Sequence, residues 1–464
     1  MAENCYQTAV SRMLALGHEL AQTPSHKFDL AHMRVLLAAL NHPERRFPGV
    51  LIAGTNGKGS TAATLASILR ASGLKTGLYT SPHLVRINER IRINDEPLGD
   101  DDFARLHGEI DSVAEGLVER GALPWHPSFF EMMTAIAFEY FAQQRVEIGV
   151  LEVGMGGRLD ATNVVEPALS IITDISLDHQ KYLGDTVAEI AREKAGIIRR
   201  SGVVVTLPQQ PEANDVIGNT VLELDARAVN AVPYVPPVSP GSTHYLVPGR
   251  SDTRSNGGNT KELERPAYRY PLQVMGEQIL VQTPLVGRHQ LRNVALAIAA
   301  AVEMSQRFHI TTQTIERGIR ETHWPGRFQI VAPHAAWPEI ALDVAHNPAG
   351  AWALRSALSE RYGDRPLLFV FGAMRDKAIA EMAEILFPLA QRVIATQPEN
   401  PRSATPEEIQ SAARRTGTEV VESIGDVASA LELAKEIAAK EVPIIITGSI
   451  YLVGEVIRLL GVKA

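Results

Sequence analysis

The sequence predicts an α/β protein with two domains. Apolar runs of strand length alternate with segments of helical periodicity over most of the chain, as in parallel α/β architectures. A glycine-rich stretch follows one of the first apolar runs, and the alternation restarts after residue 327. We therefore expect a larger domain with a mostly parallel sheet and a phosphate-binding loop, followed by a smaller Rossmann-like α/β domain.

The predicted elements of the first domain, residues 1–327, follow from these patterns in order. The amino-terminal "MAENCYQTAVSRMLALGHEL" is typical of an amphipathic helix, and "GVLIAG" of a buried strand. In the helix that follows, Ala62, Leu65, Ala66 and Leu69 share one face. Further strands are predicted at "KTGLYT", "EIGVLEV" and "LSIITDI", with a long helix over "SFFEMMTAIAFEYFAQQ".

A contrasting segment at 232–269 is rich in Pro, Gly, Ser and Asn, and we interpret it as an exposed insertion or long loop. The second domain, residues 328–464, begins after "WPGRF", with Pro325 and Gly326 at the joint. Its predicted strands are "EIALDVA", "PLLFVFGA", "RVIATQ" and "VPIIITG", each next to a helix-like segment.

Composition excludes several classes of protein. The 464 residues are 45% hydrophobic, which is enough for two or three cores. A net charge of −8 lacks the basic excess that nucleic-acid binding requires, and the single Cys5 excludes an internal disulfide framework. We find no signal-peptide pattern and no apolar run long enough to span a membrane. We therefore expect a soluble cytoplasmic protein that binds neither nucleic acid nor membrane.

The stretch "AGTNGKGST" resembles a phosphate-binding loop but departs from the Walker A pattern. The residue five before Gly57 is Ile52, and Gly59 separates Lys58 from Ser60. The physical requirements are nevertheless met, because a strand, a tight glycine turn and a helix start follow one another there. Ser60 is open to two interpretations, a ligand of a nucleotide-bound cation or a helix cap.

Polar residues follow three further predicted strands. Ser81 comes after "GLYT", Glu152 closes "IGVLE", and Asp178 and His179 follow "SIITDIS". Carboxyl ends of parallel strands line the ligand crevice of an open α/β sheet, so these groups predict a Mg²⁺ environment. Structural alternatives remain open: Ser81 before Pro82 is typical of a turn, and His179 of a structural histidine.

Two more segments have simple local explanations. Ser128 and Glu131 in "SFFE" form the pattern of a capping box at a helix start. Lys194 precedes Gly196 at the predicted end of a helix, where the helix dipole favours a lysine. From the residues alone, these structural interpretations are preferred.

Ten segments in order carry a resemblance over nearly the whole chain. They are "GTNGKGS", "TSPHL", "ERIRIN", "EVGMGGRLDATN", "ISLDHQKYLGDT", "REKAGI", "GRHQLRNVALAI", "PGRF", "DVAHNP" and "TGSIYLV". Together they resemble the folylpolyglutamate synthase/dihydrofolate synthase family of the Mur ligase superfamily. The irregular phosphate loop is the version that this family uses.

The resemblance implies an ATP-dependent amide ligase. The acceptor carboxylate would attack the γ-phosphate of ATP to give an acyl phosphate, which the amine of L-glutamate then converts to an amide. The implied acceptors are dihydropteroate and reduced, tetrahydrofolate-type folates. Charge on the transferring phosphoryl group calls for Mg²⁺, Lys and Arg rather than for a protein nucleophile. Relatives suggest a monomer.

The resemblance also assigns residues. ATP would be held by Gly57, Lys58, Gly59, Ser60, Asn293, Arg327 and Asp343, and would lie between the domains. Two Mg²⁺ ions would be held by Ser81, Glu152 and His179, with help from Lys194 as a carbamate. His346 and Ser449 would help to receive glutamate, and the pterin would meet Ser128, Phe129, Phe130, Leu159, Asp160 and Ala161. This overrides the structural interpretation of Lys194, while the capping box remains compatible with a pterin site.

The leading hypothesis is an enzyme with both activities, and three alternatives to it stay open. In the first alternative, a second enzyme hypothesis, the protein has only one of the two activities. A cell-wall Mur ligase is a third enzyme hypothesis, although such ligases generally carry a further amino-terminal domain for the UDP moiety. A P-loop motor is a different class, but no strand ends in the paired acids of a Walker B motif, and Glu152 stands alone in the comparable place.

Overall fold

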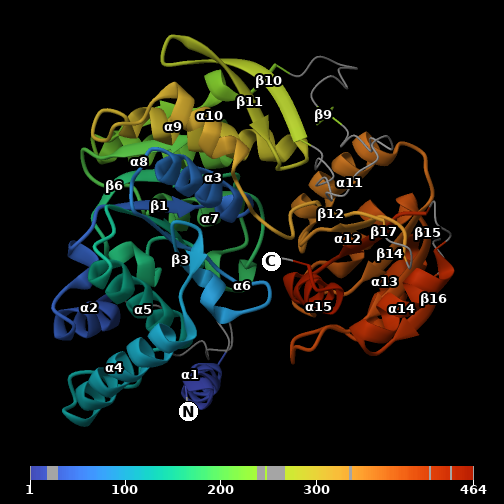
Figure 1. Cartoon of the computed structure of the whole chain (residues 1–464), viewed down its shortest axis with the longest axis horizontal. Coiled ribbons are helices and arrows are strands. Elements are labelled where there is room, and N and C mark those ends of the chain that lie inside the picture. The colour runs from blue at the N-terminus through green and yellow to red at the C-terminus, as the bar shows by residue number, and fades with distance from the viewer. Residues whose placement is uncertain are drawn as a thin grey trace, which may run out of the picture. The chain divides into compact units, whose positions relative to one another are not determined.

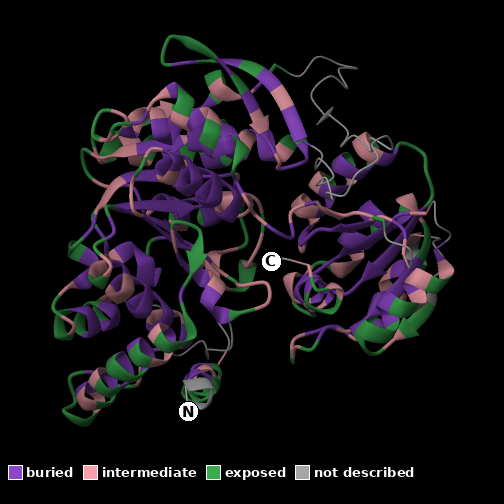
Figure 2. Ribbon diagram, viewed as in Figure 1, coloured by how far each residue is buried: buried purple, intermediate pink, exposed green. Residues whose placement is uncertain are grey.

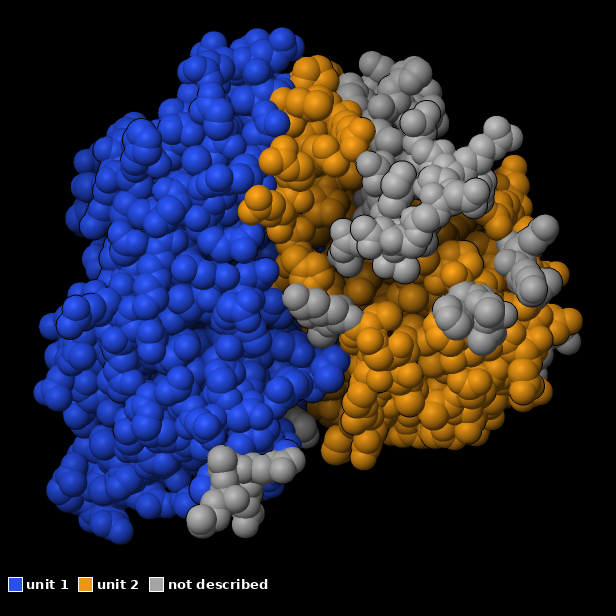
Figure 3. Space-filling view, in the orientation of Figure 1, with its two compact units in different colours: residues 1–235, 272–279, 292–319 blue, residues 236–271, 280–291, 320–464 orange. Residues whose placement is uncertain are grey.

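The computed structural model of the chain describes residues 2–17, 30–237, 246–247, 267–333, 337–416, 420–438 and 442–462. It divides into two compact units (Figure 3). Unit 1 comprises residues 1–235, 272–279 and 292–319, and unit 2 comprises 236–271, 280–291 and 320–464. The predicted joint at Pro325 and Gly326 lies a few residues inside the last segment of unit 2.

Unit 1 contains an eight-stranded sheet in the order β4-β3-β2-β5-β1-β6-β7-β8. Its strands are β1 (Gly49–Ala53), β2 (Thr76–Tyr79), β3 (Ile91–Ile93), β4 (Glu96–Pro97), β5 (Ile148–Glu152), β6 (Pro167–Ile172), β7 (Val203–Thr206) and β8 (Arg227–Asn230). The six strands from β2 to β8 in this order run parallel, and β3 and β4 extend the edge antiparallel. The predicted mostly parallel sheet is confirmed.

Helices connect these strands and cover the sheet (Figure 1). Those of the chain up to residue 320 are α1 (Ala2–Ala15), α2 (Leu30–Ala39), α3 (Lys58–Ala71), α4 (Asp100–Glu119), α5 (Phe129–Gln143), α6 (Gln180–Leu183), α7 (Val187–Ala195), α8 (Pro211–Glu223), α9 (Arg288–Met304) and α10 (Thr312–Arg320). In Figure 2, α3 and the central strands are buried, whereas α4 exposes one side along its length.

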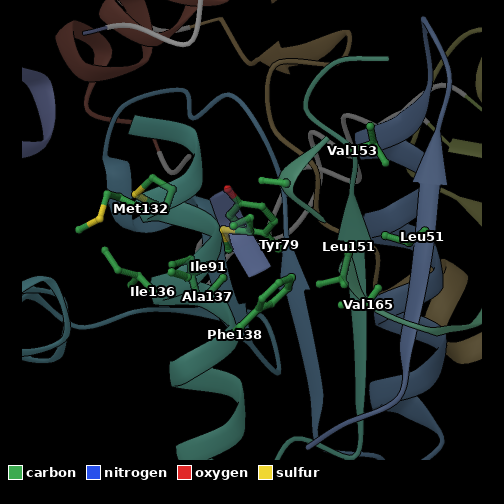
Figure 4. Close-up of a cluster of buried hydrophobic side chains, with 14 of the residues drawn as sticks. Leu51, Tyr79, Ile91, Met132, Ile136, Ala137, Phe138, Leu151, Val153 and Val165 are labelled. Atoms are coloured by element: carbon green, nitrogen blue, oxygen red, sulfur yellow. The ribbon is translucent and has the colours of Figure 1, made fainter. Parts of the chain in front are cut away.

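The core of unit 1 follows from the alternation of side chains along a strand. Leu51 and Ala53 of β1 belong to a cluster that includes side chains of α5, and Val50 and Ile52, which alternate with them, point to the other face. Figure 4 shows Phe138 of α5 with Leu51 and Leu151 in this cluster. Both faces of β1 are buried, which explains why its sequence is an uninterrupted apolar run.

Unit 2 contains a six-stranded sheet in the order β12-β13-β17-β14-β15-β16. Its strands are β12 (Gln329–Val331), β13 (Ile340–Leu342), β14 (Leu367–Phe371), β15 (Ala390–Thr396), β16 (Val420–Ile424) and β17 (Ile444–Thr447). Only β12 is antiparallel to its neighbour within this sheet. The helices are α11 (Pro348–Tyr362), α12 (Ile379–Leu386), α13 (Pro406–Ala413), α14 (Val427–Ile437) and α15 (Ile450–Leu460).

The segment predicted as an insertion, 232–269, falls mostly outside the described residues. Its described residues include a short 3-10 helix, η4 (Val232–Tyr234), and a two-residue strand, β9 (Leu246–Val247). β9 pairs with β10 (Ala267–Val274) in a sheet of order β11-β10-β9, where β11 is Glu277–Thr283. Across the residues that the structure describes, none of the helices combines the length and apolar character needed to cross a membrane.

Candidate active site

The glycine-rich loop lies between β1 and α3, as predicted. Gly57 has φ 88°, in the left-handed region, and caps α3, which begins at Lys58. A Cβ on Gly57 would lie 2.2 Å from Asn293 Oδ1, so the loop passes directly against α9. The hydroxyl of Ser60 is buried and has no hydrogen-bond partner among the described residues. The backbone donors at the start of α3 and this hydroxyl suit a phosphate group.

Two lysines converge on this loop. Lys58 Nζ donates to the carbonyl oxygens of Gly54 at 3.1 Å and Thr55 at 3.2 Å. Lys194 Nζ donates to the same Gly54 oxygen at 2.9 Å, although it is 140 residues away in sequence. Burial, with the nearby positive charge of Lys58, lowers the pKa of Lys194 from 10.5 to about 7. A substantial fraction of Lys194 is therefore a neutral amine near neutral pH.

The position of Lys194 differs from that expected of a solvated lysine at a helix end. It occupies the last turn of α7, which is capped at Gly196 as predicted. Its side chain, however, is only 4% exposed and points to the phosphate loop rather than to solvent. The carboxylate of Asp178 is close enough to oppose the lowering of the Lys194 pKa.

Ser81 and Glu152 lie together at the carboxyl edge of the sheet. Their strands, β2 and β5, are parallel neighbours, with Tyr79 opposite Leu151. The backbone N–H of Ser81 donates to Glu152 Oε2 at 3.2 Å, and Glu152 is 5% exposed. A buried carboxylate beside a hydroxyl provides the oxygen ligands that Mg²⁺ prefers.

His179 belongs to the loop that follows β6. It has φ 52°, and its backbone N–H donates to Asp178 Oδ1 at 2.8 Å. Its ring Nε2 lies 3.9 Å from Asp178 Oδ2. Within the described ranges, no three His, Cys, Asp or Glu side chains form a ready metal cage. Any cation here would complete its coordination with hydroxyl, water or phosphate oxygens, as Mg²⁺ commonly does.

Sequence reasoning missed the contacts that join this loop to the phosphate loop. The backbone N–H groups of Thr55 and Asn56 both donate to Asp174 O, at 2.9 and 3.3 Å. Arg292 of α9 donates to Asp174 Oδ1 at 2.6 Å, beside the predicted Asn293. Arg292 and Asp174 are 118 residues apart, and a contact between such distant residues leaves no local pattern in the sequence. The sequence pointed to this region of α9 only through Asn293, the neighbour of Arg292.

The predicted pterin residues fall into two segments of unit 1. Ser128 caps α5 and forms the predicted capping box with Glu131. Phe129 is buried with Arg90 over its ring at 5.0 Å, whereas Phe130 is half-buried and lies 6.0 Å from the Tyr79 ring, centroid to centroid.

The second segment surrounds a 3-10 helix, η3 (Ala161–Val164). Leu159 is half-buried, whereas Asp160 and Ala161 are buried. Asp160 accepts hydrogen bonds from the backbone N–H groups of Met155 and Thr162, both at 3.0 Å. Burial raises the pKa of Asp160. Its Oδ1 also accepts the hydroxyl of Thr162 at 2.6 Å, so the carboxylate is engaged in organising its own loop.

In unit 2, Asp343 follows β13 and holds two turns. Its carboxylate accepts the backbone N–H groups of Phe328 and Ala345, each at 2.9 Å. Burial raises the pKa of Asp343, and the charge of Arg327 opposes the shift. Arg327 is therefore close enough to Asp343 for its charge to act on that carboxylate.

His346 and Ser449 lie at the same edge of the unit 2 sheet. They follow β13 and β17, which are parallel neighbours with Leu342 opposite Ile446. His346 Nδ1 lies 2.9 Å from Val344 O, so Nδ1 carries a proton and donates to that oxygen. Ser449 is buried and caps α15 by accepting the backbone N–H of Tyr451 at 3.1 Å.

Comparison with known proteins identifies the family of this chain. Residues 326–450 match the Mur ligase, glutamate ligase domain. The Bacillus subtilis dihydrofolate synthase/folylpolyglutamate synthase is 34% identical over 93% of this chain and 94% of its own length. The chain belongs to the dihydrofolate synthase/folylpolyglutamate synthase family. The Escherichia coli dihydrofolate synthase/folylpolyglutamate synthase is similar too, at 33% identity over 89% of this chain and 86% of its own.

Solved structures of the dihydrofolate synthase/folylpolyglutamate synthase family share the fold. A Mycobacterium tuberculosis folylpolyglutamate synthase complexed with ADP and AMPPCP matches with a TM-score of 0.81 at 31% identity, covering 98% of this chain and 99% of that one. The E. coli enzyme in complex with DHPP and ADP matches with a TM-score of 0.77 at 29% identity, covering 98% and 97%. The predicted Mur ligase-type fold is confirmed, and the chain is an ATP-dependent ligase.

Proposed function

We propose that this chain joins L-glutamate to dihydropteroate, forming dihydrofolate, and adds further γ-linked glutamates to reduced folates. The observation that carries the proposal is the convergence of Lys58, Lys194 and the start of α3 on one phosphate loop. Family membership supplies the class of acceptor, since several relatives are named for both activities.

The reaction requires activation of a carboxylate. The acceptor carboxylate oxygen bonds to the γ-phosphorus of ATP and the bond to the β-phosphate oxygen breaks, which gives an acyl phosphate and ADP. The amine of glutamate then adds to the acyl carbon and loses a proton. Collapse of the tetrahedral intermediate expels phosphate and leaves the amide. The protein's task is to position these groups and to stabilise the developing negative charge.

Residues of the phosphate loop would perform the first step. Backbone N–H groups at Gly57 to Ser60 would hold the phosphates. The ammonium group of Lys58, which now donates to Gly54 O, would donate to the outer phosphates instead. Asn293, which lies against Gly57, would fix the loop on the nucleotide. Arg327 and Asp343 of unit 2 would contribute further nucleotide contacts.

The donor set fits Mg²⁺. Ser81 and Glu152 would hold one ion and His179 would contribute to a second, which together would neutralise charge on the transferring phosphoryl group. Lys194 is suited to carbamate formation because a neutral amine is the form that reacts with CO₂, and its lowered pKa makes that form available. The carbamate would replace a buried cation by an anion beside the metal residues.

Glutamate and pterin would be received by the remaining residues. Ser449 and His346 follow neighbouring strands at one sheet edge, and the ring of His346 would accept the proton that the amine releases. Phe130 would offer an aromatic face to the pterin, and the loop that Asp160 organises, with Leu159 and Ala161, would lie against the ring.

The test is phosphate release from ATP with dihydropteroate or tetrahydrofolate, each with and without L-glutamate. The proposal expects release only when an acceptor and glutamate are both present, with both acceptors active. Activity with tetrahydrofolate alone would reduce the function to polyglutamylation. Release without any acceptor would contradict a ligase.

A further inference from the structure

His32 of α2 is buried between two hydrogen-bond acceptors. Its Nδ1 lies 3.0 Å from Glu131 Oε1, and its Nε2 lies 3.0 Å from the carbonyl oxygen of Trp125. A carbonyl oxygen can only accept, so Nε2 must carry a proton. A neutral ring has one N–H, and the second contact therefore depends on a further proton between Nδ1 and Glu131.

Geometry around Glu131 places that proton on the ring. Glu131 Oε2 already accepts hydrogen bonds from the backbone N–H of Ser128 at 2.8 Å and from its hydroxyl at 2.7 Å. Burial raises the pKa of Glu131, but the hydrogen bonds from His32 and Ser128 outweigh this effect, and the net shift is downward. This favours the carboxylate form of Glu131, and both His32 contacts are then satisfied when the ring is an imidazolium that donates from both nitrogens.

Trp125 holds the ring from a second direction. The imidazole stacks on the indole with centroids 5.6 Å apart and planes inclined by 23°. An imidazolium gains a cation–π attraction in this arrangement that a neutral imidazole lacks. The charged form of His32 thus contacts Trp125 twice, by stacking on the indole and by donating to the Trp125 carbonyl oxygen.

Other ionisable groups lie around α2. α2 packs against α4, α5 and η3. Among the described residues, the buried ionisable groups on or next to those elements are His107 and Asp111 of α4 and Asp160 before η3, and Glu131 of α5 is partly buried. Asp111 pairs with Arg12 and His126, Asp160 accepts from its own loop, and Arg34 on α2 itself is exposed. Glu131 is the carboxylate that forms an ion pair with His32.

We propose that His32 is a positioning residue for the pterin-bearing substrate. In its imidazolium form it fixes the turn from Trp125 to Ser128 together with Glu131, and so holds the segment that presents Phe130. This inference rests on the proposed function. Loss of the proton removes a donor from either Trp125 O or Glu131 and releases one side of the segment. The KM for dihydropteroate should then rise with pH as His32 loses its charge, while the KM for ATP should not, because none of these groups touches the phosphate loop.

Steady-state kinetics of three variants test the proposal. His32→Gln should raise the dihydropteroate KM about tenfold at neutral pH, the effect of losing a charged hydrogen bond, with kcat and the ATP KM within about twofold of wild type. His32→Arg keeps a permanent positive charge and several donors, so it should restore a low KM and remove its rise at alkaline pH. Glu131→Gln should raise the KM as His32→Gln does.

A matched control is available in the same unit. His42 Nδ1 lies 2.9 Å from Glu44 Oε1, in a second His–Glu pair. Its carboxylate belongs to the 3-10 helix η1 (Pro43–Arg45), which packs against α5, and the pair forms no part of the turn from Trp125 to Ser128. His42→Gln should leave the dihydropteroate KM and its pH dependence unchanged. An unaltered KM in His32→Gln, or equal increases for dihydropteroate and ATP, would overturn the proposal.

A second measurement separates this inference from the proposed activity. In ¹⁵N-histidine-labelled protein, the signals that His32→Gln removes should show both ring nitrogens protonated at neutral pH, and Trp125 fluorescence should change over the pH range in which one proton is lost. A neutral His32 at neutral pH would overturn the inference even if the ligase is active. Absence of turnover in a protein with these spectral signatures would instead count against the proposed acceptor.

Discussion

Lys58 and Lys194 donate hydrogen bonds to one backbone oxygen, the carbonyl of Gly54. Two ammonium groups that share an acceptor repel each other, and the pKa of Lys194 is lowered by burial and by this neighbouring charge. A bound polyphosphate would relieve the repulsion by drawing Lys58 away from the shared oxygen. The pair is therefore organised to respond to nucleotide.

Lys58→Ala should lower kcat by about 10²- to 10³-fold or more, because it removes a positive charge from the transferring phosphoryl group. The fold should be retained, since the side chain bonds only to loop carbonyls in the part of the structure described. Phosphate release and circular dichroism would check both points. Lys75→Ala is the control: it removes a lysine bonded to Gln144, and should be nearly fully active. Wild-type turnover in Lys58→Ala would refute the site assignment.

Glu152→Ala should abolish turnover by removing the buried carboxylate beside Ser81. Glu152→Gln, which keeps the shape, should need about 10- to 100-fold more Mg²⁺ for half-maximal phosphate release. Glu147→Ala provides the comparison, because Glu147 lies just before the other end of β5 and bonds to the Lys75 backbone. A Mg²⁺ requirement that is equal in Glu152→Gln and wild type would contradict the metal role.

Lys194→Met should change the pH dependence of stability. The pKa of Lys194 is about 7 in the folded protein and near 10.5 when unfolded, so between these values the unfolded chain binds the extra proton and folding becomes more favourable as pH rises. Relative to Lys194→Met, the wild type should gain up to about 1.4 kcal/mol per pH unit above pH 7. Urea unfolding of both proteins in CO₂-free buffer at pH 6 to 9 measures this difference. Parallel curves would show that Lys194 does not titrate as described.

Gly57→Ala and Gly73→Ala form a matched pair. Both glycines have positive φ, 88° and 87°, but a Cβ on Gly57 would meet Asn293 at 2.2 Å, whereas nothing lies within 4 Å of one on Gly73. Gly73→Ala should cost only the left-handed conformation, about 1 kcal/mol. Gly57→Ala should cost more and should also weaken ATP binding, measured by calorimetry. Equal effects on both stability and ATP affinity would contradict the close approach of α9.

The local features of this molecule were predictable from sequence. Apolar runs identified the parallel strands, and the capping box at Ser128 and Glu131 was identified by its spacing alone. The glycine turn also followed from local chemistry, because a strand, a turn and a helix start require only neighbouring residues. Strand ends then placed Ser81 and Glu152 at one edge, as the structure confirms.

Contacts between distant segments could not be predicted in the same way. Lys194 has the sequence context of a solvated lysine at a helix end, and only the folded chain brings it to Gly54. The resemblance to a family, rather than its own surroundings in sequence, singled it out. Neither its local sequence nor the family resemblance singled out His32. Its partner Glu131 is 99 residues away, and the helical pattern around His32 is that of an ordinary core face.

The two backbone hydrogen bonds from Thr55 and Asn56 to Asp174 O make the phosphate loop and the loop that carries His179 parts of one hydrogen-bonded body. A ligand that orders one loop also partly orders the other, so a second ligand that binds there loses less conformational entropy. Nucleotide and metal ion should accordingly bind with positive cooperativity. Thermodynamic linkage then requires that the factor by which ATP tightens metal binding equals the factor by which metal tightens ATP binding.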